Sequence, residues 1–194
     1  MPEDPHFSQL VSLACHDLRT PLATIFGFAR TLSKLDLEDA PGRYVEMIEA
    51  ASGQMAELLD ELSLVARIEA GRYEPALGEA DSLELARQAA TDLGEERVVV
   101  SGEGTLVRVD PEAVRRALGK LAKAAARHGG HDEVALAVRG GVFEVTPVSG
   151  TAAPVLLGDE LRELGAAAAA ALIRALGGSL AVEDERLIVT LPVA

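Results

Sequence analysis

The sequence predicts an all-α helical hairpin that forms a dimeric four-helix bundle, followed by an α+β sandwich. Over roughly the first 70 residues, apolar side chains recur in steps of three and four, the spacing of one face of an α-helix. Beyond residue 80, short valine-rich segments alternate with helical segments. Residues 74–80 separate the two patterns and contain Pro75 and Gly78, which favour a linker. We therefore expect two domains, residues 1–74 and residues 75–194.

Two long helices account for the first domain. The apolar stripe of the first comprises Phe7, Leu10, Ala14, Leu18, Pro21, Ile25, Ala29 and Leu32, and that of the second comprises Val45, Ile48, Ala51, Met55, Leu58, Leu62, Val65 and Ile68. Pro41 suits the first turn of the second helix, and Gly71 suits its C-terminal cap. A single hairpin would leave much of both stripes in water, whereas two hairpins bury them in a four-helix bundle. The sequence therefore predicts a homodimer.

The second domain is expected to be a mixed sheet under helices. Helices are predicted at residues 81–93, with Asp81 or Ser82 as the N-cap, at residues 111–127, opened by Pro111, and at residues 159–176. Strands are predicted at residues 98–100, 105–109, 133–138, 142–145, 179–182 and 187–191. The third and fourth strands form a hairpin that turns at two consecutive glycines.

Charge and composition disfavour several classes of function. The chain has 31 Asp and Glu against 18 Lys and Arg, a net charge of −13, so a nucleic-acid backbone or an anionic membrane would repel it. A single cysteine excludes an internal disulfide and is typical of the cytosol. The N-terminus lacks the pattern of a signal peptide, and the longest apolar stretch, residues 164–173, is too short to span a bilayer. These features predict a cytoplasmic protein with no nucleic-acid partner and no membrane insertion.

Residues 16–22 read His-Asp-Leu-Arg-Thr-Pro-Leu, and His16 is their candidate nucleophile. His16 lies two residues from the stripe positions on either side, so it points about 200° away from them, towards solvent. A neutral imidazole nitrogen is a competent nucleophile near neutral pH. Asp17 can fix the ring tautomer by accepting a hydrogen bond. Arg19 can offset phosphate charge, and Thr20, one helical turn on, can orient a water or a phosphoryl oxygen.

This segment resembles the H box of the dimerisation and phosphotransfer domain of bacterial two-component histidine kinases: His, an acidic residue, two further residues, Thr or Asn, and Pro. Residues 58–71, which read LLDELSLVARIEAG, resemble the second helix of that domain at the expected distance. The resemblance covers the first 74 residues and implies that His16 carries a phosphoryl group. It also implies that Asp17 assists phosphorylation and that Thr20 assists dephosphorylation of the partner.

The second domain resembles the ATP-binding domain of the same kinases without its nucleotide-binding residues. The family's first box reads Asn-Leu-x-x-Asn-Ala-x-Lys, and here Lys120 and Ala124 replace the two asparagines. The second asparagine holds Mg²⁺ in the family, and an alanine methyl cannot coordinate a hard cation. Residues 146–150 lack the Asp of the next box, the lid segment that follows is short, and only Gly165 remains of the last glycine-rich box. The resemblance therefore implies a degenerate ATPase-like domain that cannot make phosphohistidine from ATP.

Two smaller features favour structural interpretations. His128 and His131 lie in a glycine-containing segment with no cysteine nearby, so an exposed turn is favoured over a metal site. Lys120 and Lys123 could meet an anion, but a solvated helix face is favoured.

Two classes of function follow from these features. The first is a histidine phosphotransferase, in which His16 accepts a phosphoryl group from the aspartate of a response-regulator receiver domain and passes it to another receiver. The receiver brings the Mg²⁺, so the chain needs no cofactor of its own. The second is a pseudokinase scaffold that binds a response regulator or a kinase without phosphotransfer. A phosphatase that uses Thr20 to aim water at the receiver's aspartyl phosphate is a third reading. The identity of the partners and the direction of phosphate flow stay open.

Overall fold

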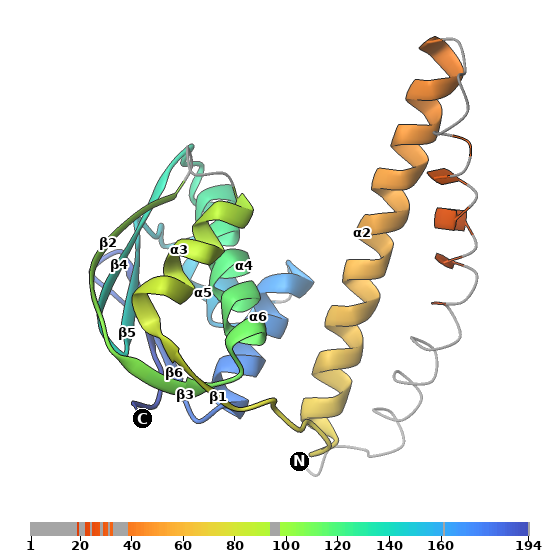
Figure 1. The fold of residues 1–194 in the computed structure, drawn as a ribbon. Coiled ribbons are helices and arrows are strands. Elements are labelled where there is room, and N and C mark those ends of the chain that lie inside the picture. The colour runs from red at the N-terminus through yellow and green to blue at the C-terminus, as the bar shows by residue number, and fades with distance from the viewer. Residues whose placement is uncertain are drawn as a thin grey trace. The chain divides into compact units, whose positions relative to one another are not determined.

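The computed structural model describes residues 19, 22–23, 25–27, 29–30, 32, 39–93, 98–160 and 162–193. The chain divides into two compact units, Met1–Arg72 and Tyr73–Ala194 (Figure 1). The first unit contains the predicted helical hairpin and the second contains a mixed sheet with helices, so this part of the predicted fold class is confirmed, while the dimeric four-helix bundle stays a prediction.

Helix α2, Asp39–Glu69, is the long helix of the first unit. It ends as predicted at Gly71, whose φ of +62° is a conformation that side chains with a Cβ rarely adopt. The N–H of Gly71 donates to the carbonyl of Ile68, and the N–H of Arg72 donates to that of Arg67, so two of the last carbonyls of the helix are satisfied. Every described position between Arg19 and Leu32 is also helical, in agreement with the first predicted helix.

The second unit is built on a five-stranded sheet with the order β2-β4-β5-β7-β6. Its strands are β2 (Val98–Gly104), β4 (Val134–Gly140), β5 (Val142–Thr146), β6 (Ser179–Glu183) and β7 (Arg186–Thr190). Strands β2 and β4 are parallel, and the other neighbours are antiparallel. A separate two-stranded sheet pairs β1 (Gly78–Asp81) with β3 (Leu106–Val109).

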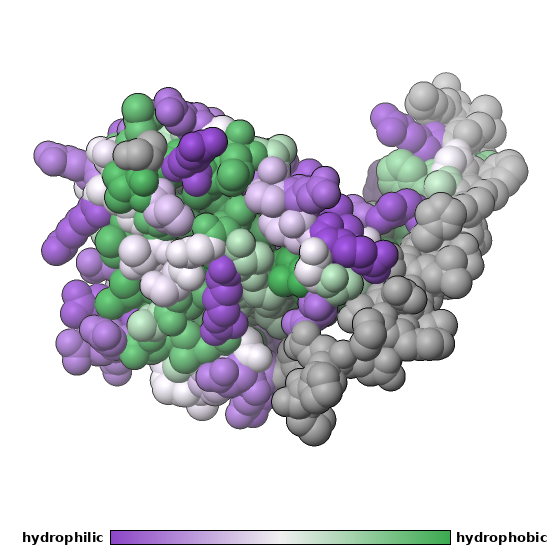
Figure 2. Space-filling view, turned by 90° about the horizontal axis from the view of Figure 1, so that it is seen from below, coloured by the Kyte–Doolittle hydropathy of each residue, from purple (hydrophilic) through white to green (hydrophobic). Residues whose placement is uncertain are grey.

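Helices cover one face of the five-stranded sheet (Figure 1). They are α3 (Ser82–Leu93), α4 (Pro111–Gly129) and α6 (Leu164–Ala175), with the short α5 (Ala153–Leu156) packed against α4 and α6. Alternate strand residues point into this layer and form the core, namely Leu136, Val138, Phe143, Val145, Leu187 and Val189, all almost fully buried. The large exposed hydrophobic residues of the unit, Leu77, Val99, Leu106 and Val193, come from four different segments. Figure 2 likewise shows hydrophobic and hydrophilic residues intermixed on one face of the unit, which is ordinary for a folded surface.

Three predicted elements need correction. Gly78 does not break the chain: it begins β1 and pairs with Val109, so residues 78–81 are not linker. Strand β2 continues past the valines to Gly104, because β4 pairs with it along its whole length. The predicted helix at 159–176 begins only at Leu164, since Glu163 is extended, with a φ of −143°. The sequence interpretation also missed α5.

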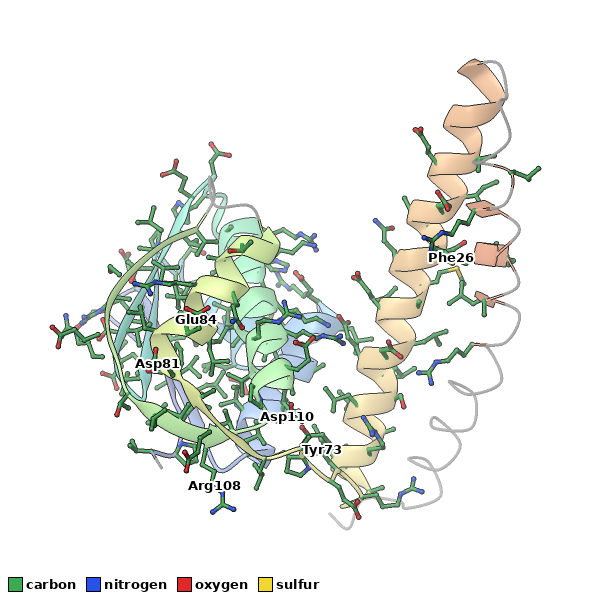
Figure 3. The ribbon with its side chains drawn as sticks, in the orientation of Figure 1. Phe26, Tyr73, Asp81, Glu84, Arg108 and Asp110 are labelled. Carbon is green, nitrogen blue, oxygen red and sulfur yellow. The ribbon has the colours of Figure 1, made fainter. Side chains whose placement is uncertain are left out.

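Asp81, one of the two predicted caps, is the N-cap of α3. Its Oδ1 accepts the N–H of Glu84 at 3.0 Å, and both residues lie at the start of the helix (Figure 3). Ser82 has another role. Its hydroxyl is fully buried, donates to the carbonyl of Gly140 and accepts the N–H of Thr105, so it ties the end of β4 to the residue between β2 and β3.

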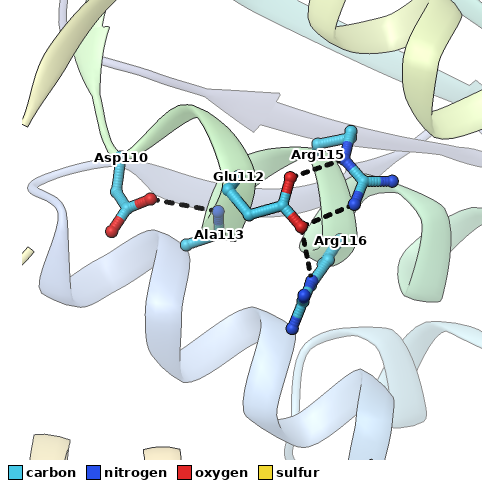
Figure 4. A network of polar contacts seen from close by, with 5 residues as sticks. All are labelled: Asp110, Glu112, Ala113, Arg115 and Arg116. Atoms are coloured by element: carbon cyan, nitrogen blue, oxygen red, sulfur yellow. Dashed lines mark hydrogen bonds and ion pairs between the residues drawn. The ribbon is translucent and has the colours of Figure 1, made fainter. Parts of the chain in front are cut away.

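Asp110 holds the start of α4. Its Oδ1 accepts the N–H of Ala113 at 3.1 Å, and its Oδ2 accepts the N–H of Ala76 at 3.0 Å. One carboxylate therefore caps the helix and ties the segment before β1 to it. In the same first turn, the Glu112 carboxylate accepts hydrogen bonds from both Arg115 and Arg116 (Figure 4).

We expect Asp110→Ala to lower the free energy of unfolding of the second unit by about 1–2 kcal/mol, because a cap and a second hydrogen bond are lost together. Asp110→Asn should lose less, since asparagine caps helices nearly as well. The measurement is urea unfolding of the whole chain, followed by circular dichroism at 222 nm. The matched control is Asp132→Ala, an exposed carboxylate in a loop. Equal losses for Asp110→Ala and the control would contradict this role.

Candidate functional site

Of the four predicted site residues, the structure describes one. His16, Asp17 and Thr20 lie outside the described residues, and their roles remain predictions. Arg19 is described and lies in a helical position of the first unit.

Arg19 forms an ion pair that the sequence interpretation missed. Its Nη2 donates to Oδ1 of Asp60 on α2 at 2.5 Å, so the pair connects the segment of the predicted H box to the second helix of the hairpin. Both side chains are about half exposed, 52% and 59%, so water and salt screen the pair, which contributes at most about 1 kcal/mol. The pair partly neutralises the guanidinium, which weakens its predicted pull on a phosphoryl group. No periodicity could have found Asp60, because the two residues are 41 positions apart.

The hairpin has two apolar faces. One is buried within the unit and includes Val45 and Ala66 on α2, spaced by a multiple of seven residues, and Leu22 and Ala29 on the first helix, seven residues apart; the polar Ser52 is buried among them. The other face is 36–53% exposed and comprises Ile25, Phe26, Leu32, Ile48, Met55 and Leu58. On α2 the two faces adjoin, because the exposed residues lie on average about 65° around the helix axis from the buried ones. Each helix thus has one broad apolar surface that is partly inside the hairpin and partly in water.

In the second unit, the position where the resemblance implies a Mg²⁺-binding asparagine holds a packed alanine. Ala124 is fully buried and lies one helical turn before His128, so both side chains share one face of α4. The Nε2 of His128 bonds Oε2 of Glu163 at 3.0 Å, and Arg127 pairs with the same oxygen at 3.3 Å. The segment that ends at Glu163 is therefore attached to this part of α4.

Two hydroxyl groups attach the start of the same segment to the C-terminal end of α4. Thr151 Oγ1 and Ser149 Oγ both approach the carbonyl oxygen of His128, at 3.3 and 3.5 Å, and lie 2.9 Å from each other. Val148 is buried, and its N–H donates to the carbonyl of Glu185 at 2.7 Å. Residues 148–151 are thus bound on two sides.

Helix α5 fills the space between these attachments. Ala152, Val155 and Leu156 are fully buried, and α5 packs against both α4 and α6. The Nη2 of Arg174 on α6 donates to the carbonyl of Leu157 at 2.7 Å. The segment at the position of the family's lid is here buried at its centre and held by polar contacts at its ends.

The two histidines differ from the expected exposed turn. His128 belongs to the last turn of α4 and is largely buried against Glu163, while His131 follows the left-handed Gly130 that caps the helix. Within the described part of the chain, no group of three His, Cys, Asp or Glu side chains is arranged to hold a metal ion. None of the helices described there is both long enough and apolar enough to cross a membrane.

Comparison with known proteins identifies histidine kinases as relatives of this chain. Residues 8–71 match the family model of the His Kinase A (phospho-acceptor) domain. Histidine protein kinase DivJ of Caulobacter vibrioides is 30% identical over 116 residues, 55% of this chain and 19% of DivJ. Hybrid signal transduction histidine kinase L of Dictyostelium discoideum is 28% identical over 102 residues, 53% of this chain and 6% of that kinase. The chain thus matches only a small part of either relative.

A solved structure extends the likeness to nearly the whole chain. The crystal structure of full-length ShkA in complex with AMPPNP has a TM-score of 0.74 with 22% identity, and the match covers 96% of this chain and 46% of ShkA. At that identity the match shows the fold alone. Together these findings make the chain a protein similar to two-component histidine kinases, with a phospho-acceptor domain at residues 8–71 followed by a unit with the fold of their ATP-binding domain.

Proposed function

We propose that the chain is a histidine phosphotransferase of a two-component phosphorelay. The observation that carries the proposal is the contrast between its two units. Residues 8–71 match a phospho-acceptor domain and contain the complete motif around His16. In the second unit, Ala124 stands where the resemblance implies a metal-binding asparagine, and the centre of the segment 148–163 is packed into the core. The chain therefore accepts phosphate but does not take it from ATP.

The chemistry requires only the residues of the first unit and a phosphorylated partner. A ring nitrogen of His16 attacks the phosphorus of an aspartyl phosphate on a receiver domain, so a P–N bond forms while the P–O bond to the aspartate breaks. The freed carboxylate stays on the receiver, and the same steps in reverse load a second receiver. Asp17 holds the ring tautomer that leaves one nitrogen free to attack. The receiver supplies the Mg²⁺ that offsets the developing charge, so this chain needs no cofactor of its own.

The proposal includes a cytoplasmic homodimer with no nucleic-acid partner and no membrane insertion. The exposed apolar face of the hairpin supports the dimer, because Ile25, Ile48, Met55 and Leu58 lose their contact with water when a second hairpin covers them. The net charge of −13 supports the absence of a nucleic-acid partner.

Light scattering at micromolar concentration should give twice 20.3 kDa for the wild-type chain. Met55→Glu with Leu58→Glu should give the monomer, because burying unpaired carboxylates costs several kcal/mol each. The control is Glu57→Lys, an exposed residue that points about 200° away from Met55 and should leave the dimer intact. A monomeric wild type, or a double variant that still dimerises, would refute the bundle.

The transfer itself is tested with a panel of receiver domains from the same genome, each labelled at its aspartate with a small phosphodonor and Mg²⁺. Wild type should take up label that is stable in alkali and labile in acid, as a phosphoramidate is. His16→Gln keeps a polar side chain of similar reach but lacks the nucleophile, so it should take up none while remaining dimeric. Asp17→Asn should slow transfer about tenfold or more, because a neutral amide orients the ring less strongly. Thr20→Ala should leave the transfer rate nearly unchanged.

The same experiment separates the alternatives. If His16→Gln is labelled as strongly as wild type, the acceptor is another residue and the proposal is wrong. If receivers bind wild type but none transfers label to it, the chain is a pseudokinase scaffold. If wild type instead releases inorganic phosphate from a receiver and Thr20→Ala does not, the chain acts as a phosphatase that depends on Thr20.

A further inference from the structure

Residues 149–160, which we call the strap, form most of their backbone hydrogen bonds among themselves. Every N–H of the strap for which the structure gives a backbone acceptor donates to a carbonyl of the strap, from Ala152 to Ser149 at its start and from Glu160 to Pro154 at its end. Its helix, α5, has four residues, too few to be stable without packing. The closed position of the strap therefore depends on its attachments to the rest of the second unit.

Buried side chains at the centre make the first attachment. Ala152, Val155 and Leu156 are fully buried, and α5 packs against α4 and α6. Behind α5, the Nη2 of Arg174 on α6 donates to the carbonyl of Leu157 at 2.7 Å. These contacts fix the centre of the strap, and other residues must fix its ends.

His128 on α4 binds both ends. Its carbonyl oxygen accepts from the hydroxyl of Thr151 at 3.3 Å, and the hydroxyl of Ser149 lies 3.5 Å from the same oxygen. Its Nε2 donates to Oε2 of Glu163, three residues after the strap, at 3.0 Å, and Arg127 pairs with that oxygen at 3.3 Å. The side chains of His128 and Glu163 are only 20% and 15% exposed, so water competes little for their bond.

We propose that the strap opens and closes as one unit while the sheet, α3, α4 and α6 stay folded, and that His128 is the clamp that keeps both of its ends closed. The ends are coupled through α5. Thr151 precedes the buried Ala152, so withdrawing α5 breaks the bond at the start. The N–H of Glu160 donates to the carbonyl of Pro154 in α5, so the other end moves with the helix. The proposal is independent of phosphotransfer by His16.

Hydrogen exchange of the native full chain, measured for single amides by NMR at several urea concentrations, tests the proposal. In the wild type, three strap amides, those of Ala153, Leu157 and Glu160, should share one opening constant. That constant should be at least tenfold larger than the constant of Leu121, in the middle of α4. It should also depend less on urea, because opening the strap exposes less surface than unfolding the unit.

Two variants each remove one bond of the clamp. His128→Ala loses the ring that binds Glu163, and Thr151→Val loses one hydroxyl with almost no change of shape. Each should raise the opening constants of all three strap amides by a common factor, at least tenfold for His128→Ala and at least threefold for Thr151→Val. His128→Gln, whose side-chain amide can still donate to Glu163, should stay within threefold of the wild type.

The matched control is Glu112→Ala, which removes two ion pairs at the other end of α4. These pairs are present whether the strap is closed or open, so the control should leave the opening constants of the three strap amides within twofold of the wild type.

Three results would overturn the proposal. The first is a set of strap amides with the opening constant and urea dependence of Leu121, because the strap would then open only when the unit unfolds. The second is an effect confined to Ala153 in Thr151→Val and to Glu160 in His128→Ala, which would make the two ends independent. The third is an equal effect of His128→Gln and His128→Ala, because the hydrogen bond would then not hold the strap.

Discussion

The burial of one side of helix α4 is the constraint on which the rest of the second unit depends. Leu118 and Leu121 are fully buried there, and burying a leucine stabilises a fold by about 2 kcal/mol, more than any of the exposed ion pairs on the same helix. Packing therefore decides the rotation of α4 about its axis. Once that rotation is set, the face with Ala124 and His128 is directed towards the segment 148–163, and the exposed Lys123 is directed towards solvent.

That arrangement bears on the proposal that the second unit does not use ATP. A ligand site in such a fold needs a mobile cover and polar groups aimed at phosphate. Here the segment at the position of such a cover is packed at its centre, where Ala152, Val155 and Leu156 are fully buried, and its end is held by the hydrogen bond between His128 and Glu163. Reopening the segment would expose apolar side chains and break this contact at the same time. The alanine at position 124 and the packing of the segment thus support the same proposal from chemistry and from packing.

Most of the fold could be predicted from the sequence, because its signals are local. Helical periodicity placed α2, the glycine at position 71 placed its end, and Pro111 placed the start of α4. The errors fell where tertiary contacts override local preference. Gly78 pairs with Val109 instead of breaking the chain, and Glu163 is held in an extended conformation while its carboxylate binds His128. In the candidate site, the motif around His16 could be recognised from residue order alone, whereas the pairing of Arg19 with Asp60 depends on how two distant helices meet.

The account rests on one claim, that His16 receives its phosphoryl group from a protein aspartate and not from ATP. The most direct measurement gives the chain, in parallel, γ-labelled ATP with Mg²⁺ and a receiver domain labelled at its aspartate, and locates the acid-labile label by mass spectrometry. The account predicts a phosphohistidine at residue 16 in the second reaction and none in the first. Labelling of His16 by ATP and Mg²⁺ alone would contradict it and would show that the second unit still acts as a kinase.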